Sequence, residues 1–396
     1  MGYSARFALA ALCILGGVAP AVAQSTWVSG YLQTVPLFSG ATQFSQNSFS
    51  DFNRIRLTID PSWGPLSVET AYDNTVSFRQ RAGSSGFGLD TVPRGGEWLP
   101  LGGTHTGSNR EHVLWSHRLD RLNIGFSPTD AVDLTVGRQA VSWGTTLFLT
   151  PADPFLPFSP ADPFRQFRGG VDAARLRLYP GPLSALDLVV RVTDTPMGQE
   201  VTALGRGLTT WRNWELSAWA GTLYGDAAGA VGATGGIGLW AVRVEAVIRA
   251  IGGRIIGRGT VGLDRNIQVG GRDLYLVLEY QRDGLAASEP DEYLALLLTS
   301  EFLRGELQTL GRDEAVAQAA YQFHPLWSLS GLAMWNMNDG SVLLAPGVGY
   351  SAGDETTISG GIYFGHGADT VTATRPLPSE FGLSGTTGYL SVSFFF

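Results

Sequence analysis

GYLSVSFFF, residues 388 to 396, closes the chain and decides its fold. Apolar side chains recur at every second position, so Leu390, Val392, Phe394 and Phe396 share one face of an extended strand. An ordinary buried strand would also alternate in this way. A chain that stops on three phenylalanines, with no polar tail, instead favours a strand whose apolar face contacts lipid.

The same alternation recurs along the whole chain and is the primary signal for strands. Residues 52–60, 241–251 and 273–281 each place apolar side chains on one face and charged or polar ones on the other. Strands of about ten residues, separated by alternately short and long connections, are typical of a membrane barrel. The alternation of connections holds throughout only if a weak strand lies near 199–209. We therefore predict an all-β transmembrane antiparallel barrel of 18 strands, with 16 as the alternative.

The first 23 residues have the features of a cleaved signal peptide. Arg6 precedes the apolar run FALAALCILGGVAPAV, and Ala21, Val22 and Ala23 form a small-x-small cleavage site. After residue 23, no run reaches the roughly 18 apolar residues of a membrane helix, so a closed barrel is the remaining way to span. We expect a signal peptide over 1–23, cleaved near Ala23, and a barrel over 24–396 in a Gram-negative outer membrane.

Charge and cysteine content exclude several classes of partner. The net charge of −8 argues against a nucleic-acid partner, which would require a basic surface. The single cysteine, Cys13, lies inside the predicted signal peptide, so the mature chain has neither a disulfide framework nor a thiolate metal site. We expect no cofactor and no metal ion.

Tryptophan residues fall where a barrel would place them. Aromatic side chains gather at strand ends, where the bilayer meets water. The tryptophans near predicted strand ends are Trp27, Trp63, Trp143, Trp211, Trp214, Trp327 and Trp335.

Polar faces of the predicted strands should line the lumen. Eight arginines and eight acids have this inward parity, and such a balance gives no strong preference for anions. They either pair across neighbouring strands as a hydrated wall or steer small charged solutes. The arginines are Arg54, Arg56, Arg121, Arg175, Arg177, Arg191, Arg243 and Arg249; the acids are Asp60, Glu69, Asp73, Asp187, Glu215, Glu245, Asp264 and Glu279.

A long irregular loop at 151–168 is the main candidate for a constriction. It contains PADPF twice, at 151–155 and 160–164, and its prolines exclude a helix interior or a central strand. Its phenylalanines indicate that the loop docks on other parts of the molecule. If it folds inward, Asp153, Asp162, Arg165 and Arg168 would lie at a constriction of the pore. The alternative is a loop that packs over the barrel mouth and serves stability or subunit contacts.

Residues 137–178 resemble a pattern in Gram-negative outer-membrane barrels of the porin and alginate-export type. There a strand ends in Gly-Arg-Gln and Trp-Gly, a loop rich in Pro, Asp and Phe follows, and the next strand opens with Gly-Val-Asp. The closing strand is similar to the C-terminal signal that the outer-membrane assembly machinery reads. An alginate exporter has a strongly basic lumen, whereas this one is balanced, so the resemblance implies a passive channel. By this resemblance, the pore-loop anchors are Arg138, Gln139, Trp143, Asp153, Arg168 and Asp172.

These observations predict a porin-like channel for passive diffusion or export of small polar or charged solutes. The expected partners are outer-membrane lipid, the solute and the assembly machinery, and an oligomer is possible. One alternative is a plugged barrel with a surface-binding or structural role. Another is an outer-membrane hydrolase, but Ser116 and His117 are adjacent and so point to opposite faces of a strand. We therefore expect no enzymatic activity.

Overall fold

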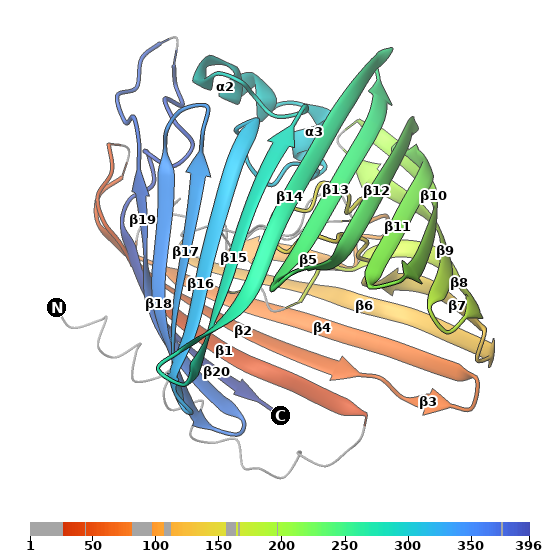
Figure 1. Ribbon diagram of the computed structural model, residues 1–396. Coiled ribbons are helices and arrows are strands. Elements are labelled where there is room, and N and C mark those ends of the chain that lie inside the picture. Colours follow the sequence, from red (N-terminus) through yellow and green to blue (C-terminus); the bar gives the residue numbers. More distant parts are fainter. Residues whose placement is uncertain are drawn as a thin grey trace.

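The computed structural model is a closed antiparallel β-barrel (Figure 1). It describes residues 27–43, 45–80, 97–106, 112–155, 164, 167–195, 197–373 and 375–396. The predicted signal peptide lies outside these ranges. Each wall strand pairs with its two neighbours, and the first strand pairs with the last to close the wall. In the described residues the wall has 18 strands, which confirms the prediction.

The weak strand predicted near 199–209 is the tenth element, and it keeps the short and long connections in phase. In order around the barrel the wall strands are β1 (Val28–Ser39), β2 (Ser48–Ile59), β4 (Leu66–Arg79), β6 (Val113–Thr129), β7 (Val132–Gln139), β8 (Val171–Gly181), β9 (Ser184–Thr195), β10 (Gly198–Trp211), β11 (Trp214–Leu223), β12 (Asp226–Ile237), β13 (Trp240–Ile251), β14 (Arg254–Val269), β15 (Arg272–Asp283), β16 (Asp313–His324), β17 (Trp327–Asn336), β18 (Val342–Gly353), β19 (Thr356–His366) and β20 (Thr387–Phe395).

Five short elements lie in the connections. β3 (Ser62–Trp63) pairs with the start of β4, and β5 (Gly102–Thr106) pairs with β6. The loop between β15 and β16 contains η1 (Pro290–Glu292), α2 (Tyr293–Leu296) and α3 (Ser300–Leu303), drawn at the long-loop end of the barrel in Figure 1. None of the helices in the described ranges is long and apolar enough to cross a membrane.

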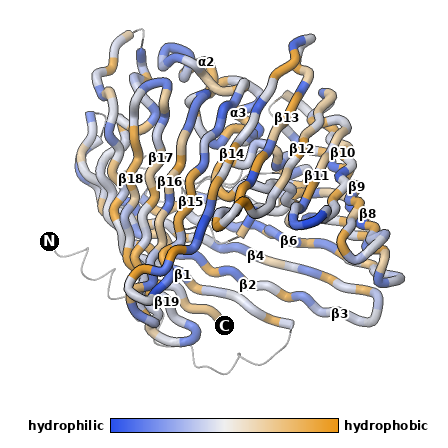
Figure 2. Tube along the Cα trace, in the orientation of Figure 1, coloured by the Kyte–Doolittle hydropathy of each residue, from blue (hydrophilic) through white to orange (hydrophobic). Residues whose placement is uncertain are grey.

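The two faces of the wall have the reverse polarity of a soluble protein. On β13, Ile248 faces outward and is 63% exposed, whereas Glu245 and Arg249 face inward and are 1% and 3% exposed. Hydrophilic and hydrophobic residues are interleaved along the strands in this way (Figure 2). A continuous apolar outer face would be costly in water and suits the hydrocarbon of a bilayer.

Six of the seven tryptophans predicted near strand ends lie there. Trp27, Trp63, Trp211 and Trp335 are exposed side chains at or near strand ends, where a membrane meets water. Trp143 was expected there too, and that prediction is wrong. It lies beyond the end of β7 and is buried, because the chain has already left the wall.

An unusually short strand lets the chain enter the barrel. β7 has only eight residues and pairs with β6 over residues 122–129 of that strand. Above that point β5 takes its place, because residues 102–106 pair with residues 114–118 of β6. Asp194 of β9 then donates its backbone N–H to the carbonyl of Glu97, just ahead of β5. The chain after Gln139 can therefore turn inward without leaving β6 unpaired.

Gly137 sits at the close approach that ends β7. Its φ of +118° disfavours any residue with a side chain, and an added Cβ would lie 2.3 Å from the Leu122 carbonyl oxygen. We predict that Gly137→Ala lowers the free energy of unfolding by about 1–3 kcal/mol, through strain and overpacking. The measurement is the urea midpoint of the purified barrel in detergent. The matched control is Gly207→Ala on β10, where an added Cβ meets nothing within 4 Å; equal midpoints for the two variants would contradict the prediction.

Candidate functional site

Residues 140–155, which we name the inner segment, fold into the lumen (Figure 1). The segment contains neither helix nor strand, yet it is as buried as a protein core. Val141, Trp143, Leu149, Ala152 and Phe155 are each no more than 3% exposed. The predicted constriction loop began at Pro151, so the observed inward turn starts about one strand-length earlier in the chain.

Two wall carboxylates hold the backbone of the inner segment. Glu245 of β13 accepts the backbone N–H groups of Thr146 (2.8 Å) and Ala152 (2.9 Å), and also that of Thr145. Because an anionic acceptor strengthens each bond, this is a firm attachment.

Glu279 of β15 acts in the same way on the residues between. It accepts the backbone N–H groups of Leu147 (2.6 Å), Phe148 (2.9 Å) and Leu149 (2.8 Å). Two inward-facing acids therefore satisfy six N–H groups of a segment that has no ladder partner. Next in the chain, the Thr150 N–H is bonded to the Gln308 side chain at 2.7 Å.

Indole side chains attach the segment to the wall between β9 and β13. The Trp143 Nε1–H donates to Asp187 of β9 at 2.9 Å, and the Trp219 Nε1–H of β11 donates to the Ala152 carbonyl at 2.8 Å. Phe155 packs edge-on against Trp143, with ring centroids 5.0 Å apart. These residues share a buried apolar cluster with Val247 of β13.

Leu149 makes the contact with the far part of the wall. It is fully buried among Val316 of β16, Met334 of β17, Leu343 of β18 and Tyr363 of β19. Since the segment starts at β7 and contacts residues from β9 to β19, it lies across the lumen.

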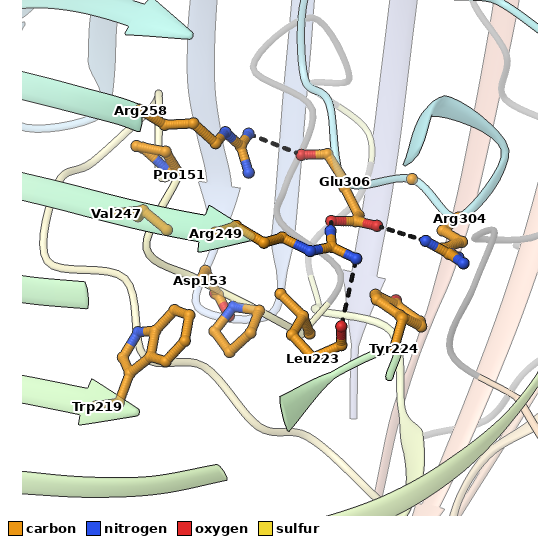
Figure 3. A pocket seen from close by; sticks show the side chains of 12 residues that line it. Pro151, Asp153, Trp219, Leu223, Tyr224, Val247, Arg249, Arg258, Arg304 and Glu306 are labelled. Carbon is orange, nitrogen blue, oxygen red and sulfur yellow. Dashed lines mark hydrogen bonds and ion pairs between the residues drawn. The ribbon is translucent and has the colours of Figure 1, made fainter. Parts of the chain in front are cut away.

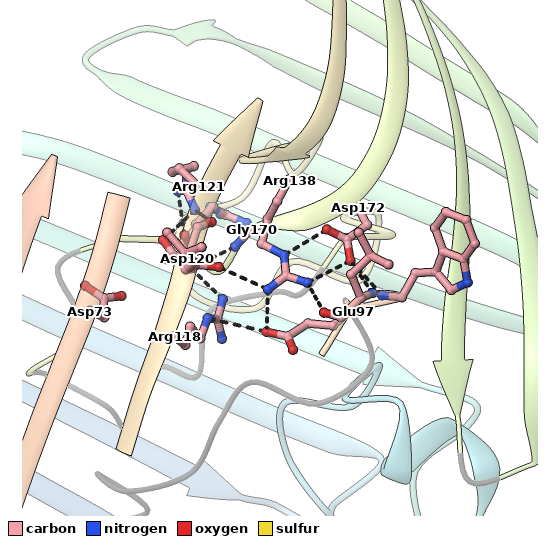
Figure 4. Close-up of polar contacts among 12 residues, drawn as sticks. Asp73, Glu97, Arg118, Asp120, Arg121, Arg138, Gly170 and Asp172 are labelled. Carbon is pink, nitrogen blue, oxygen red and sulfur yellow. Dashed lines mark hydrogen bonds and ion pairs between the residues drawn. The ribbon is translucent and has the colours of Figure 1, made fainter. Parts of the chain in front are cut away.

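A network of charges clasps the base of the loop (Figure 4). Arg138 at the end of β7 and Asp172 at the start of β8 form a bidentate pair, Nε–Oδ1 2.8 Å and Nη2–Oδ2 2.7 Å. Asp120 of β6 accepts the Gly170 N–H at 3.0 Å and also pairs with Arg121 at 2.5 Å. Arg138 is 1% exposed, so its bidentate ion pair with Asp172 is buried and its geometry is fixed.

Asp153 ties the inner segment back to its own base. Its carboxylate forms an ion pair with Arg168 and accepts a hydrogen bond from the Ser142 hydroxyl at 3.0 Å. Burial raises the pKa of the Asp153 carboxyl, and the neighbouring Arg168 opposes that shift.

Gln139, also predicted as an anchor of the pore loop, donates from its side-chain amide to the Ala173 carbonyl at 3.1 Å. Of the residues predicted for the constriction loop, Asp162 and Arg165 lie outside the described residues.

Most residues predicted to line the pore are paired across neighbouring strands. Arg56 lies 2.9 Å from both Asp73 and Asp120. Arg54 donates to the Phe164 carbonyl, and Arg191 donates to the Tyr224 hydroxyl. Glu215 lies on β11 without an ion pair in the described ranges. Asp60 was expected to line the pore, but it lies exposed just after the end of β2. The remaining pairs are Arg121–Glu69 (3.6 Å), Arg175–Asp187 (2.5 Å), Arg177–Asp133 (3.5 Å), Arg243–Asp264 (2.8 Å) and Arg249–Asp226 (3.0 Å).

A second cluster of charges, next to residues 151–154 of the inner segment, was not predicted from the sequence. Figure 3 shows Arg249, Arg258 and Arg304 gathered around Glu306, with Tyr224 beside them. Arg258 donates to the Glu306 carbonyl at 3.0 Å, and its guanidinium lies 2.7 Å from Asp283. Burial raises the pKa of the Glu306 carboxyl, and the three neighbouring arginines oppose that rise. Glu306 belongs to the β15–β16 loop, and alternation along strands carries no signal for a loop that folds inward.

Asp120 was missed for a different reason. A bulge in β6 inserts Asp120 as an extra residue opposite Ala71 and Tyr72 of β4, so the adjacent residues Asp120 and Arg121 are both buried. Adjacent opposite charges inside a predicted strand were the available signal. Within the described ranges, no group of three His, Cys, Asp or Glu side chains is arranged to hold a metal ion.

Comparisons with known proteins point to one architecture. No family model matches the chain, and no curated protein matches it. Acinetobacter baumannii OccAB1 has a TM-score of 0.56 at 10% identity, covering 93% of this chain and 96% of that chain. A BenF-like porin from Pseudomonas fluorescens Pf-5 has a TM-score of 0.55 at 10% identity, with coverage of 93% and 98%. The outer membrane protein opdK from Pseudomonas aeruginosa has a TM-score of 0.52 at 10% identity, again with 93% and 98% covered. The chain therefore has the barrel fold seen in these outer-membrane porin structures.

Proposed function

We propose that the protein is an outer-membrane channel for passive diffusion or export of small polar or charged solutes. The inner segment, 140–155, is its constriction. The observation that carries the proposal is the attachment of this segment inside the lumen by Glu245 and Glu279. A closed wall, a polar lumen and a fixed narrowing are sufficient for a selective pore.

Pairing of the lumen charges argues against a long, highly charged polymer as the solute. One similar structure is that of Pseudomonas aeruginosa OpdK with vanillate. Its TM-score to this chain is 0.50. The resemblance of residues 137–178 to alginate-export barrels stays a prediction, and paired arginines do not favour a long polyanion.

Targeting and assembly are part of the same proposal. A signal peptide over 1–23 would be cleaved near Ala23, and the closing strand β20 would be read by the outer-membrane assembly machinery. In support, Leu390 of β20 faces outward and is 48% exposed, as a lipid-facing strand requires. We propose neither an enzymatic activity nor a particular oligomeric state.

A plugged barrel with a surface-binding role is the second candidate. It is favoured by contacts between two long loops at the mouth: Glu380 accepts the backbone N–H groups of Leu310 (2.9 Å) and Gly311 (3.3 Å). Glu380 also accepts a bond from the Asn336 amide at 2.8 Å. Conductance distinguishes this candidate from the channel.

We predict a steady single-channel current from the mature protein in a planar bilayer. Under a salt gradient the reversal potential should show only weak ion selectivity, because the arginines at 54, 56, 175 and 177 are bonded to acids or a carbonyl. Absence of current from folded, heat-modifiable protein would contradict the channel and favour the plugged barrel.

We predict that Glu279→Ala raises the mean conductance and the current noise. The substitution removes three charge-assisted hydrogen bonds, each contributing about 1.5–3 kcal/mol, and so loosens the inner segment. The matched control is Glu69→Ala, which removes the same charge from the lumen. In the wild type, Glu69 accepts a hydrogen bond from Asn123 of the neighbouring strand at 2.9 Å and does not contact the inner segment. If both variants change the current equally, the segment is not the constriction.

A further inference from the structure

Five consecutive wall strands contain no Asp, Glu, Lys or Arg within their bounds. They are β17, β18, β19, β20 and β1, which we name the uncharged sector. Each of the other 13 wall strands contains at least one such residue. The lumen therefore has a charged side, described above, and an uncharged side.

The half of the uncharged sector near the long loops is filled by the inner segment, where Leu149 packs against Met334, Leu343 and Tyr363. Towards the short turns the wall is hollowed by a cavity of about 160 Å³. For comparison, an apolar cavity of about 150 Å³ can hold one benzene ring. The polar lining consists of Gln33, Thr357, Ser359, Tyr389, Ser391 and Ser393.

Gln33 leaves hydrogen-bonding capacity unused at this cavity. The side chain is 5% exposed, and its amide N–H group reaches Ser391 and Ser393 only at 3.4 Å each. Its carbonyl oxygen is buried and has no hydrogen-bond partner in the described part of the chain. A buried acceptor without a partner costs free energy, and a ligand hydroxyl that donates to it would recover that cost.

Aromatic rings form the other part of the lining. The Tyr389 ring meets Phe164 edge-on, with centroids 4.8 Å apart, and lies 5.8 Å from the Tyr363 ring. Gly361 leaves room for Tyr389, because a Cβ there would lie 2.7 Å from the phenol oxygen. Phe395 completes the lining at the short-turn end. Such rings pack well against the apolar C–H groups of a cyclic ligand.

We propose that this cavity is a binding subsite for an uncharged hydroxylated ring, such as a cyclic polyol or a monosaccharide. The inference rests on the proposed channel function, because the lining residues lie on the lumen side of the wall. Hydroxyl and amide groups bond the ring's hydroxyls, and the aromatic rings contact its apolar face. A charged group entering here would lose hydration and find no counter-charge on these five strands. The nearby Arg54 of β2 already donates to the carbonyl of Phe164, a lining residue.

The test measures single-channel KCl current in a planar bilayer as myo-inositol is added. In the wild type, myo-inositol should reduce the current in a saturable way. Ser391→Ala with Ser393→Ala should raise the half-blocking concentration about fivefold or more, the contribution expected of about one hydrogen bond. The matched control is Ser328→Ala with Ser330→Ala: these serines are exposed on β17 of the same sector but do not line the cavity. Thr357→Val replaces the double serine variant if that variant does not fold.

Each result decides the inference. Saturable block that weakens only in the cavity variant supports it. KCl current that falls equally in all variants, as viscosity alone would cause, overturns the subsite and leaves the channel standing. Block by sodium benzoate in place of myo-inositol, weakened by the same variant, also overturns it, because the site would then bind an anion. Absence of KCl current from folded protein overturns the proposed function and the subsite together.

Discussion

Backbone N–H groups that leave a β-ladder must find other acceptors, and this constraint shapes the interior of the barrel. Between Thr145 and Ala152, six such groups are accepted by the carboxylates of Glu245 and Glu279. Both acids are nearly fully buried, at 1% and 4% exposed. Their charge is thus used to fix a segment of chain, and is not presented to a passing solute.

Other features follow from the need to bring that segment inside. β7 ends after eight residues, β5 covers the exposed edge of β6, and Arg138 with Asp172 clasps the point of departure. The rest of the charged side of the lumen is largely paired within the wall. The uncharged sector lacks such charge pairs, and its Gln33 retains a buried carbonyl oxygen without a hydrogen-bond partner in the described part of the chain.

Most of the fold could be predicted from the alternation of apolar and polar residues along the strands. The 18 strands, including the weak one at β10, follow from alternation and from the phase of the connections, and the outward Leu390 agrees with the reading of the last strand. Alternation says which side of the wall a residue faces, but not what fills the inside. Glu245 and Glu279 were therefore expected to line the pore, whereas they anchor the inner segment. Glu306 gave no periodic signal, because its loop is irregular.

The most direct test of the account is thiol labelling at Leu147→Cys during a single-channel recording. Leu147 lies in the inner segment, is 39% exposed, and is bonded through its N–H group to Glu279. The other cysteine, Cys13, is in the predicted signal peptide. A charged methanethiosulfonate reagent should reduce the current in one irreversible step, because the label would occupy the constriction. An unchanged current from protein shown to be fully labelled would contradict the claim that this segment narrows the pore.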